Sequence, residues 1–211
     1  MVTSGAAIDI IGVANIGYLY MRNLGHRLGA SGTKFENTIQ GLHNSFSMVS
    51  NPKFRYWEFD VRESADGVLF VFHDDHIWAK GECMNTRNMN MYDIISAGCE
   101  IDIAIPTLEQ VISELECREE PVMVEIKELI SDSCRDEIIN SVAGRRGWKL
   151  MATPERFDKS FPINGRNRWS EMASLKDVKL VRVGRHRAQL FRFSDSILGR
   201  LYLYPKWLFG F

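Results

Sequence analysis

The sequence has few cysteines and no pattern among them that would organise a metal site. The four are Cys83, Cys99, Cys117 and Cys134. They form no CxxC pair, and no histidine stands at a zinc-site spacing from them. We therefore expect free thiols in a reducing compartment.

Long apolar runs are also missing. No stretch reaches the roughly 20 consecutive apolar residues that a membrane-spanning helix needs. The partly apolar start of the chain lacks a basic region, and Asp9 interrupts it, so it does not resemble a secretory signal. We predict a soluble, cytoplasmic protein.

The whole chain has almost no net charge, but its two parts carry opposite net charges. Residues 1–130 carry 10 basic and 19 acidic side chains (net −9), and residues 131–211 carry 16 and 8 (net +8). A basic part can attract an anionic substrate, a membrane surface or nucleic acid. A solvated face is the interpretation we favour, and no nucleic-acid-binding module is recognisable.

The hydrophobic pattern predicts one α/β domain. A chain of 211 residues suffices for one sizeable core, and no repeat or linker divides it, so we predict a single domain over residues 1–211. Strands alternate with helices, which favours βαβ units and a parallel sheet. We expect residues 80–100 to be irregular. The predicted strands are 18–24, 54–61, 68–72, 122–127, 148–151, 178–183 and the tail from 201, and the predicted helices begin near 36, 107 and 138.

Charged side chains alternate on two of the predicted strands. Glu58 and Asp60 point to one face, and Glu125 and Lys127 repeat the arrangement. Carboxylates on one buried face repel unless a cation lies between them, and Mg²⁺ or Ca²⁺ prefers such oxygens. Glu125 would complete the metal shell, and Lys127 would hold an anion. Either pair alone is more typical of a solvated strand.

His26 and His73 each follow an apolar strand where a βα loop would begin. In a barrel this is the C-terminal rim, where catalytic groups collect. One histidine there is more often structural, but two histidines can act as base and acid. The guanidinium of Arg27 suits phosphate oxygens. Together with the carboxylates, these side chains indicate phosphate-ester chemistry at a metal centre.

A series of short motifs over about residues 20–130 resembles the glycerophosphodiester phosphodiesterase family. Leu28 departs from the family pattern, which has glycine there, and Phe35 stands where the family often has proline. The motifs, in order, are His26-Arg27-Leu28-Gly29, Phe35-Glu36-Asn37-Thr38, Glu58-Phe59-Asp60-Val61, Asp66-Gly67, His73-Asp74, Pro106-Thr107-Leu108-Glu109 and Glu125-Ile126-Lys127.

The resemblance implies a TIM-type (β/α) barrel, short or irregular in its C-terminal half, because only three strands can be placed after residue 130. It also implies metal-dependent hydrolysis of glycerophosphodiesters to an alcohol and sn-glycerol 3-phosphate. The implied roles are acid and base for His26 and His73, ligands of Mg²⁺ or Ca²⁺ for Glu58, Asp60 and Glu125, phosphate contacts for Arg27 and Lys127, and support of the site for Glu36 and Asn37.

Other interpretations stay open. The site would also suit a phospholipase D-like enzyme acting on lysophospholipids or sphingolipids, or a barrel that binds a metal or anion without catalysis. The expected partner is a small-molecule phosphodiester, without nucleic acid. For the aromatic tail we favour packing on the barrel over membrane contact. We expect His43 and His76 at the surface or behind the site, and the basic cluster around His186 in a solvated loop.

Overall fold

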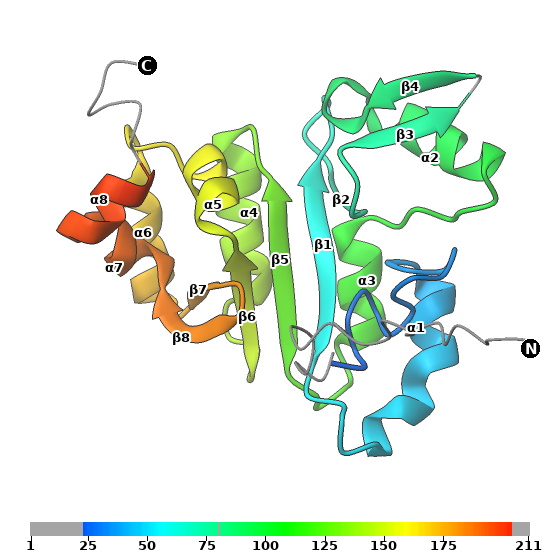
Figure 1. Ribbon diagram of the computed structural model, residues 1–211, viewed down its shortest axis with the longest axis horizontal. Helices are drawn as coiled ribbons and strands as arrows, with labels where there is room; N and C mark the ends of the chain where they lie inside the picture. The colour runs from blue at the N-terminus through cyan, green and yellow to red at the C-terminus, as the bar shows by residue number, and fades with distance from the viewer. Residues whose placement is uncertain (1–22, 80, 204–211) are drawn as a thin grey trace, which may run out of the picture.

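The computed structural model describes residues 23–79 and 81–203 (Figure 1). Most of the predicted strand at 18–24, and the tail from residue 204, lie outside this part of the chain. The described residues form a six-stranded sheet of order β2-β1-β5-β6-β7-β8 and a separate β3–β4 hairpin. The strands of the large sheet are β1 (Trp57–Glu63), β2 (Leu69–Val71), β5 (Val122–Glu128), β6 (Trp148–Ala152), β7 (Leu180–Arg182) and β8 (Arg185–Gln189).

The centre of the sheet has the parallel pairing that the alternating pattern predicts. Strands β1, β5, β6 and β7 pair in parallel, while β2 and β8 pair antiparallel at its two edges. Within the described residues the sheet is open. The helices that connect and flank it are α1 (Ile39–Ser45), α2 (Met91–Glu100), α3 (Leu108–Leu115), α4 (Asp132–Val142), α5 (Pro154–Ser160), α6 (Arg166–Leu175), α7 (Leu190–Asp195) and α8 (Ile197–Leu203), with 3-10 helices η1 (Phe46–Ser50) and η2 (Thr86–Asn88).

The two faces of the sheet differ in chemistry because side chains alternate along each strand. On β1, Trp57, Phe59 and Val61 belong to the main hydrophobic core, which also contains buried residues of α3, α4, α5 and α6. The intervening residues Glu58 and Asp60 therefore project from the opposite face. The helices therefore pack on one face of the sheet, and the polar side chains gather on the other.

The apolar run at 68–72 is buried as predicted, but its direction in the sheet differs from the expectation. After a turn at Asp66–Gly67, β2 runs back antiparallel along β1, with Val71 opposite Val61. A parallel neighbour requires a crossover of a dozen or more residues. The short connection between β1 and β2 excludes that, so the prediction of a parallel or barrel strand here was wrong.

The expectation of irregular structure at 80–100 was also wrong. Strands β3 (His76–Ala79) and β4 (Glu82–Asn85) form a hairpin, and α2 follows. The side chain of Asn90 caps α2 by accepting from the backbone N–H of Asp93. Apolar side chains of β3 and α2 form a second buried cluster, separate from the main core. At the other end, residues 201–203 close α8 rather than start a strand.

No helix within the described residues is both long and apolar enough to cross a membrane. The four cysteines of the chain are free, and only Cys134 among them is buried. This agrees with the expectation of free thiols.

The first loop contains a strained residue. Leu28 has φ of +57°, and its side chain is fully buried in the main core. A non-glycine residue in this region costs roughly 1–2 kcal/mol. The family pattern has glycine here, so Leu28 combines a backbone strain with a packing gain.

This combination predicts an unusual order of variants. Leu28→Ala should destabilise the protein by about 2–5 kcal/mol, because a buried leucine is lost. Leu28→Gly should be less destabilising than Leu28→Ala by about 1 kcal/mol, because glycine relieves the strain. At Leu42, an equally buried residue of the helix α1, the order should reverse. Urea unfolding of the four variants measures both orders, and an alanine variant more stable than glycine at position 28 would contradict the strain.

Candidate active site

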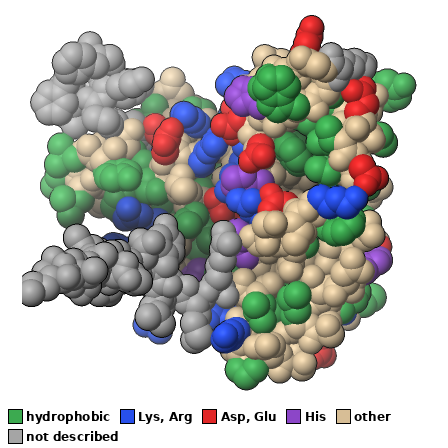
Figure 2. Space-filling view, turned by 45° about the vertical axis from the view of Figure 1, so that its right-hand side comes forward, with side chains coloured by type: hydrophobic (Ala, Val, Ile, Leu, Met, Phe, Trp, Pro, Cys, Tyr) green, Lys and Arg blue, Asp and Glu red, His purple; other side chains and the backbone are tan. Residues whose placement is uncertain are grey.

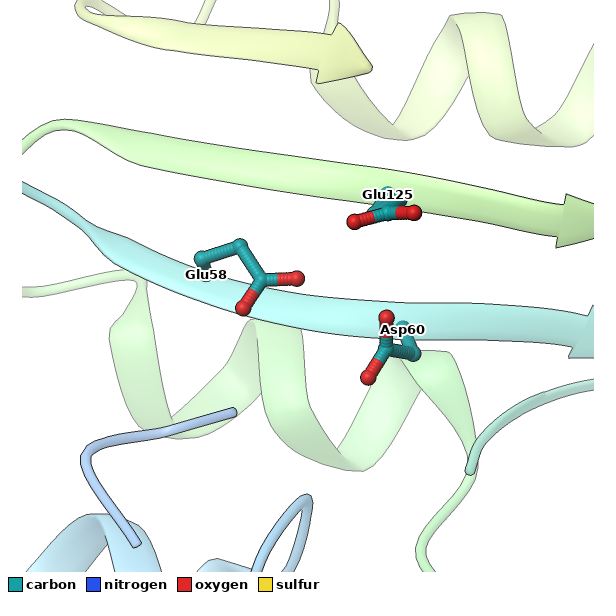
Figure 3. A group of neighbouring side chains, drawn as sticks. All are labelled: Glu58, Asp60 and Glu125. Atoms are coloured by element: carbon teal, nitrogen blue, oxygen red, sulfur yellow. The ribbon is translucent and has the colours of Figure 1, made fainter. Parts of the chain in front are cut away.

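Three carboxylates lie together on the polar face of the sheet (Figure 3). Glu58 and Asp60 come from β1 and Glu125 from β5, where the parallel register places Asp60 beside Glu125. One oxygen from each side chain lies within 4.8 Å of the others, and all three residues are buried. The structure thus brings together the three predicted metal ligands.

The surroundings of Glu58 change its ionisation. Burial and the neighbouring charge of Asp60 raise the pKa of Glu58 well above its usual range. The backbone N–H of Arg27 donates to Glu58 Oε2 over 2.8 Å and opposes this shift in the pKa only in part. Glu58 Oε1 is buried and has no hydrogen-bond partner. A buried carboxylate oxygen without a donor fits the ligand set of a hard divalent cation.

Lys127 lies against the carboxylates. Its Nζ is 2.6 Å from Glu125 Oε1 and 3.0 Å from Asp60 Oδ1. Burial alone would lower the pKa of Lys127, but Asp60 and Glu125 outweigh it, so the pKa is raised. The ammonium group is thus charged and engaged by two of the three acids, whereas the sequence predicted only a contact with an anion.

The loop before α1 supplies the next contacts of the site. Asn37 is buried with φ of +59°, and its Nδ2 donates to Asp60 Oδ2 over 2.8 Å. Arg27 Nη1 donates to Glu36 Oε1 over 2.6 Å, and Arg27 Nε lies 3.7 Å from Asp60 Oδ2. Glu36 also accepts from the backbone N–H of Gly32 over 2.9 Å. Glu36 and Asn37 therefore hold the loop and the acids in place.

His26 borders the carboxylates on the side of this loop. Its Nε2 lies 3.6 Å from Glu58 Oε2, and its Nδ1 is 2.9 Å from Ser31 Oγ. Because Ser31 engages one ring nitrogen, the other is directed toward Glu58.

His73 reaches the site by another route than the sequence suggested. It follows the antiparallel strand β2, not a parallel strand, so the reasoning from a βα loop was wrong for this residue. The backbone N–H of Phe72 donates to the carbonyl of Asp60 over 3.0 Å, and His73 lines the same cavity as Asn37, which contacts Asp60. The Nδ1 of His73 lies 2.7 Å from Asp74 Oδ1.

Arg62, Asp75 and Arg156 form a network of ion pairs that sequence reasoning missed. Arg62, whose side chain is only 1% exposed, donates from Nη2 to the carbonyl of His73 over 2.8 Å and pairs with Asp75. Arg156 Nη2 reaches the same carboxylate at 3.0 and 3.2 Å. Burial works against the ionised form of Asp75, yet the two guanidinium groups hold its pKa below its usual value. The position of Arg62, two residues after Asp60, was the available signal.

A cavity of about 250 Å³ adjoins the site. Figure 2 shows histidine, basic and acidic side chains gathered on this side of the molecule, with hydrophobic side chains beside them. The lining residues are Thr33, Lys34, Glu36, Asn37, Phe72, His73, Asp74, His76, Ile77, Trp78, Ile101 and Ile103. Because Asn37 contacts Asp60 and also lines the cavity, the cavity opens next to the carboxylates.

The other histidines lie apart from the acids. His43 is exposed and 2.7 Å from Glu114, and His76 is exposed on β3. His186 belongs to β8 rather than to a loop, and its ring stands edge-on to Tyr56.

A mostly parallel β/α sheet with buried carboxylates on its polar face defines an α/β protein with a site suited to a divalent cation. Residues 26–141, more than half of the chain, match the model of the Glycerophosphoryl diester phosphodiesterase family. The chain belongs to this family, whose fold is the TIM-type barrel. The fold class predicted from the sequence is thereby confirmed.

Solved structures agree on the fold. A glycerophosphodiester phosphodiesterase from Agrobacterium tumefaciens is similar with 23% identity and a TM-score of 0.50, over 74% of this chain and 63% of that one. A glycerophosphoryl diester phosphodiesterase from Parabacteroides distasonis is similar with 16% identity and a TM-score of 0.51, over 76% and 52%. This chain therefore matches less than two thirds of the length of either structure. A search of curated proteins finds no match.

The raised pKa of Glu58 predicts that its charge destabilises the metal-free protein. Glu58→Gln should raise the free energy of unfolding measured at neutral pH in chelator. A carboxyl whose folded pKa is raised loses stability as pH rises, so the advantage of Gln should appear above about pH 4.3 and vanish below it. Urea unfolding across this range tests the sign, and a Gln variant no more stable than the original protein would contradict it.

Proposed function

We propose that this protein hydrolyses glycerophosphodiesters to an alcohol and sn-glycerol 3-phosphate, with Mg²⁺ or Ca²⁺ as its cofactor. The observation that carries the proposal is the group of three buried carboxylates, with His26 beside Glu58 and with His73 in the adjoining cavity, in a chain of this family. Residues 1–211 would act as one domain, and the cytoplasm is the location we expect.

Glu58, Asp60 and Glu125 would hold the cation. Their oxygens are of the type that Mg²⁺ and Ca²⁺ prefer, and Glu58 Oε1 has no protein donor. When bound, the cation would supply positive charge to the phosphoryl oxygens. Arg27 and Lys127 would add two further positive charges, so that a phosphodiester anion meets a site lined by cations.

The two histidines would move protons. Asp74 at Nδ1 of His73 and Ser31 at Nδ1 of His26 orient the two rings, and Nε2 of His26 faces Glu58. One histidine would take the proton of the attacking oxygen, and the other would protonate the leaving alkoxide. The attacker would be water or a neighbouring hydroxyl of the substrate, which would give a cyclic phosphate first.

Removal of either imidazole should abolish most of the activity. His26→Ala and His73→Ala should each lower kcat at least about a hundredfold, because acid–base catalysis contributes about that much or more. Circular dichroism and urea unfolding should show an intact fold. His43→Ala, which removes an exposed histidine paired with Glu114, is the matched control and should keep full turnover. Near-normal turnover in either site variant would refute its assignment.

Chelation should remove the activity reversibly. Release of glycerol 3-phosphate from glycerophosphocholine should stop in EDTA and return with Mg²⁺ or Ca²⁺, since the acids need a cation between them. Glu125→Gln should weaken binding of the metal at least about tenfold in calorimetry, because one charged ligand is lost. Glu114→Gln, a change at an exposed acid outside the site, is its control. Full activity in chelator would contradict the metal centre.

The same assays separate the alternatives. Binding of metal without turnover of any diester would indicate a non-catalytic barrel. Phosphorus NMR of the products distinguishes a cyclic phosphate from the product of attack by water.

A further inference from the structure

His186 lies over the polar face of the sheet, although its strand β8 is at the edge opposite β2. Three strands separate β8 from β1 in the sheet, yet Nε2 of His186 is 3.4 Å from the hydroxyl oxygen of Tyr56. The two rings stand edge-on with their centroids 5.4 Å apart. Tyr56 directly precedes β1 and packs with Met123 and Met151, which are apolar side chains of this face. The β7–β8 hairpin therefore folds back over the face that carries the carboxylates.

One nitrogen of the His186 imidazole has no partner. A tyrosine hydroxyl that donates to Nε2 leaves the proton of the neutral ring on Nδ1. Nδ1 is buried and makes no hydrogen bond within the part of the chain that the structure describes. A buried donor without an acceptor costs free energy. This side of the ring therefore lacks an acceptor oxygen.

Lys149 adds a positive charge to the same face. The parallel register sets Glu58, Met123 and Lys149 in one row across β1, β5 and β6. Two strand spacings, about 10 Å, thus separate the backbone positions of Lys149 and Glu58. Figure 1 shows the β7–β8 hairpin next to the lower half of β6, the strand that carries Lys149. Unlike Lys127, which the acids engage, Lys149 forms no ion pair with a carboxylate of the described residues.

Arg55 supplies a second cation. It directly precedes Tyr56, and its guanidinium forms no ion pair with an acid in residues 23–79 and 81–203. Burial lowers the pKa of His186, and the charges of Lys149 and Arg55 lower it further. Like charges that meet without an acid between them favour the binding of an anion. Lys149 and His186 are half-buried and Arg55 is exposed, so an anion can approach them from solvent.

We propose that Arg55, Lys149 and His186 bind the phosphate group of inorganic phosphate or of a phosphate monoester. A phosphate monoester carries about two negative charges at neutral pH and three acceptor oxygens. This matches two cations and one unused imidazole donor. Met123 stands between Lys149 and Glu58, so this phosphate site is distinct from the carboxylates. The inference goes beyond the proposed hydrolysis and does not depend on it.

Titration of the metal-free protein tests the phosphate site. Calorimetry in EDTA should show saturable binding of one equivalent of inorganic phosphate or of sn-glycerol 3-phosphate. Lys149→Ala should weaken the Kd at least about tenfold, because a charge-assisted hydrogen bond is lost. Lys176→Ala removes an exposed lysine at the end of α6 and is the matched control, with an unchanged Kd. Equal affinity in Lys149→Ala and the original protein would overturn the inference.

The imidazole reports on the phosphate site directly. In nitrogen-15 NMR the pKa of His186 should rise when phosphate binds, because the anion offsets the charges of Lys149 and Arg55. The signal of His186 is assigned by its loss in His186→Gln. This titration uses the original protein, so it decides the inference even if Lys149→Ala does not fold. An unchanged pKa of His186 at saturating phosphate would contradict the site.

Two comparisons exclude other locations and ligands. Arg27→Ala should leave the Kd for phosphate in EDTA unchanged, because the carboxylates repel an anion when no cation is bound. Loss of binding in Arg27→Ala but not in Lys149→Ala would place the phosphate at the carboxylates and overturn the inference, and so would equal affinity for acetate and phosphate. A tighter Kd for sn-glycerol 3-phosphate than for inorganic phosphate would identify the monoester as the ligand, and equal values the phosphate group alone.

Discussion

The parallel pairing of β1 with β5 is the constraint on which the site depends. It sets Asp60 beside Glu125, and the alternation of side chains adds Glu58 to the same buried face. Like charges in a poorly solvated place oppose folding unless they are compensated. Lys127, Asn37 and the backbone of Arg27 compensate part of this charge, but Glu58 Oε1 keeps no donor. The remaining imbalance makes this group of carboxylates one that suits a divalent cation.

A second set of charges, of which Arg62 is buried, holds the backbone of the loop that carries His73. Strand β1 carries Arg62 on the same face as the acids, and its guanidinium holds both the carbonyl of His73 and the carboxylate of Asp75. Arg156 of α5 meets Asp75 from the other side. These ion pairs and the hydrogen bond to the carbonyl of His73 fix the backbone from which the imidazole projects. Strand β1 thus carries two of the three carboxylates and also the arginine that anchors the loop of His73.

The sequence predicted the parallel centre of the fold and the residues of the site better than the parts between them. Alternating charges on apolar strands show a shared face directly, so the meeting of Glu58, Asp60 and Glu125 could be foreseen. The strand direction of β2 depends on the length of a turn, and the apolar run alone does not reveal it. The β3–β4 hairpin and α2 were missed because a segment rich in methionine and asparagine was interpreted as irregular. One of these asparagines, Asn90, caps α2. The role of His73 stays a prediction from its motif, and the structural reason given for it, a βα loop after a parallel strand, was wrong.

The open sheet of the described residues does not weaken the geometry of the site, because β1, β5 and two loops supply all of its groups. What the neighbouring strands contribute is a packed layer beside the acids. Met123, Met151 and Val181 are buried together on the polar face, and Tyr56 packs against them. Burial and the charge of Glu58 raise the pKa of Tyr56. A less polar surrounding strengthens both the repulsion among buried acids and their attraction for a cation. Strands β6 and β7 carry none of the three carboxylates, but Met151 and Val181 give this face of the sheet its apolar side chains beside them.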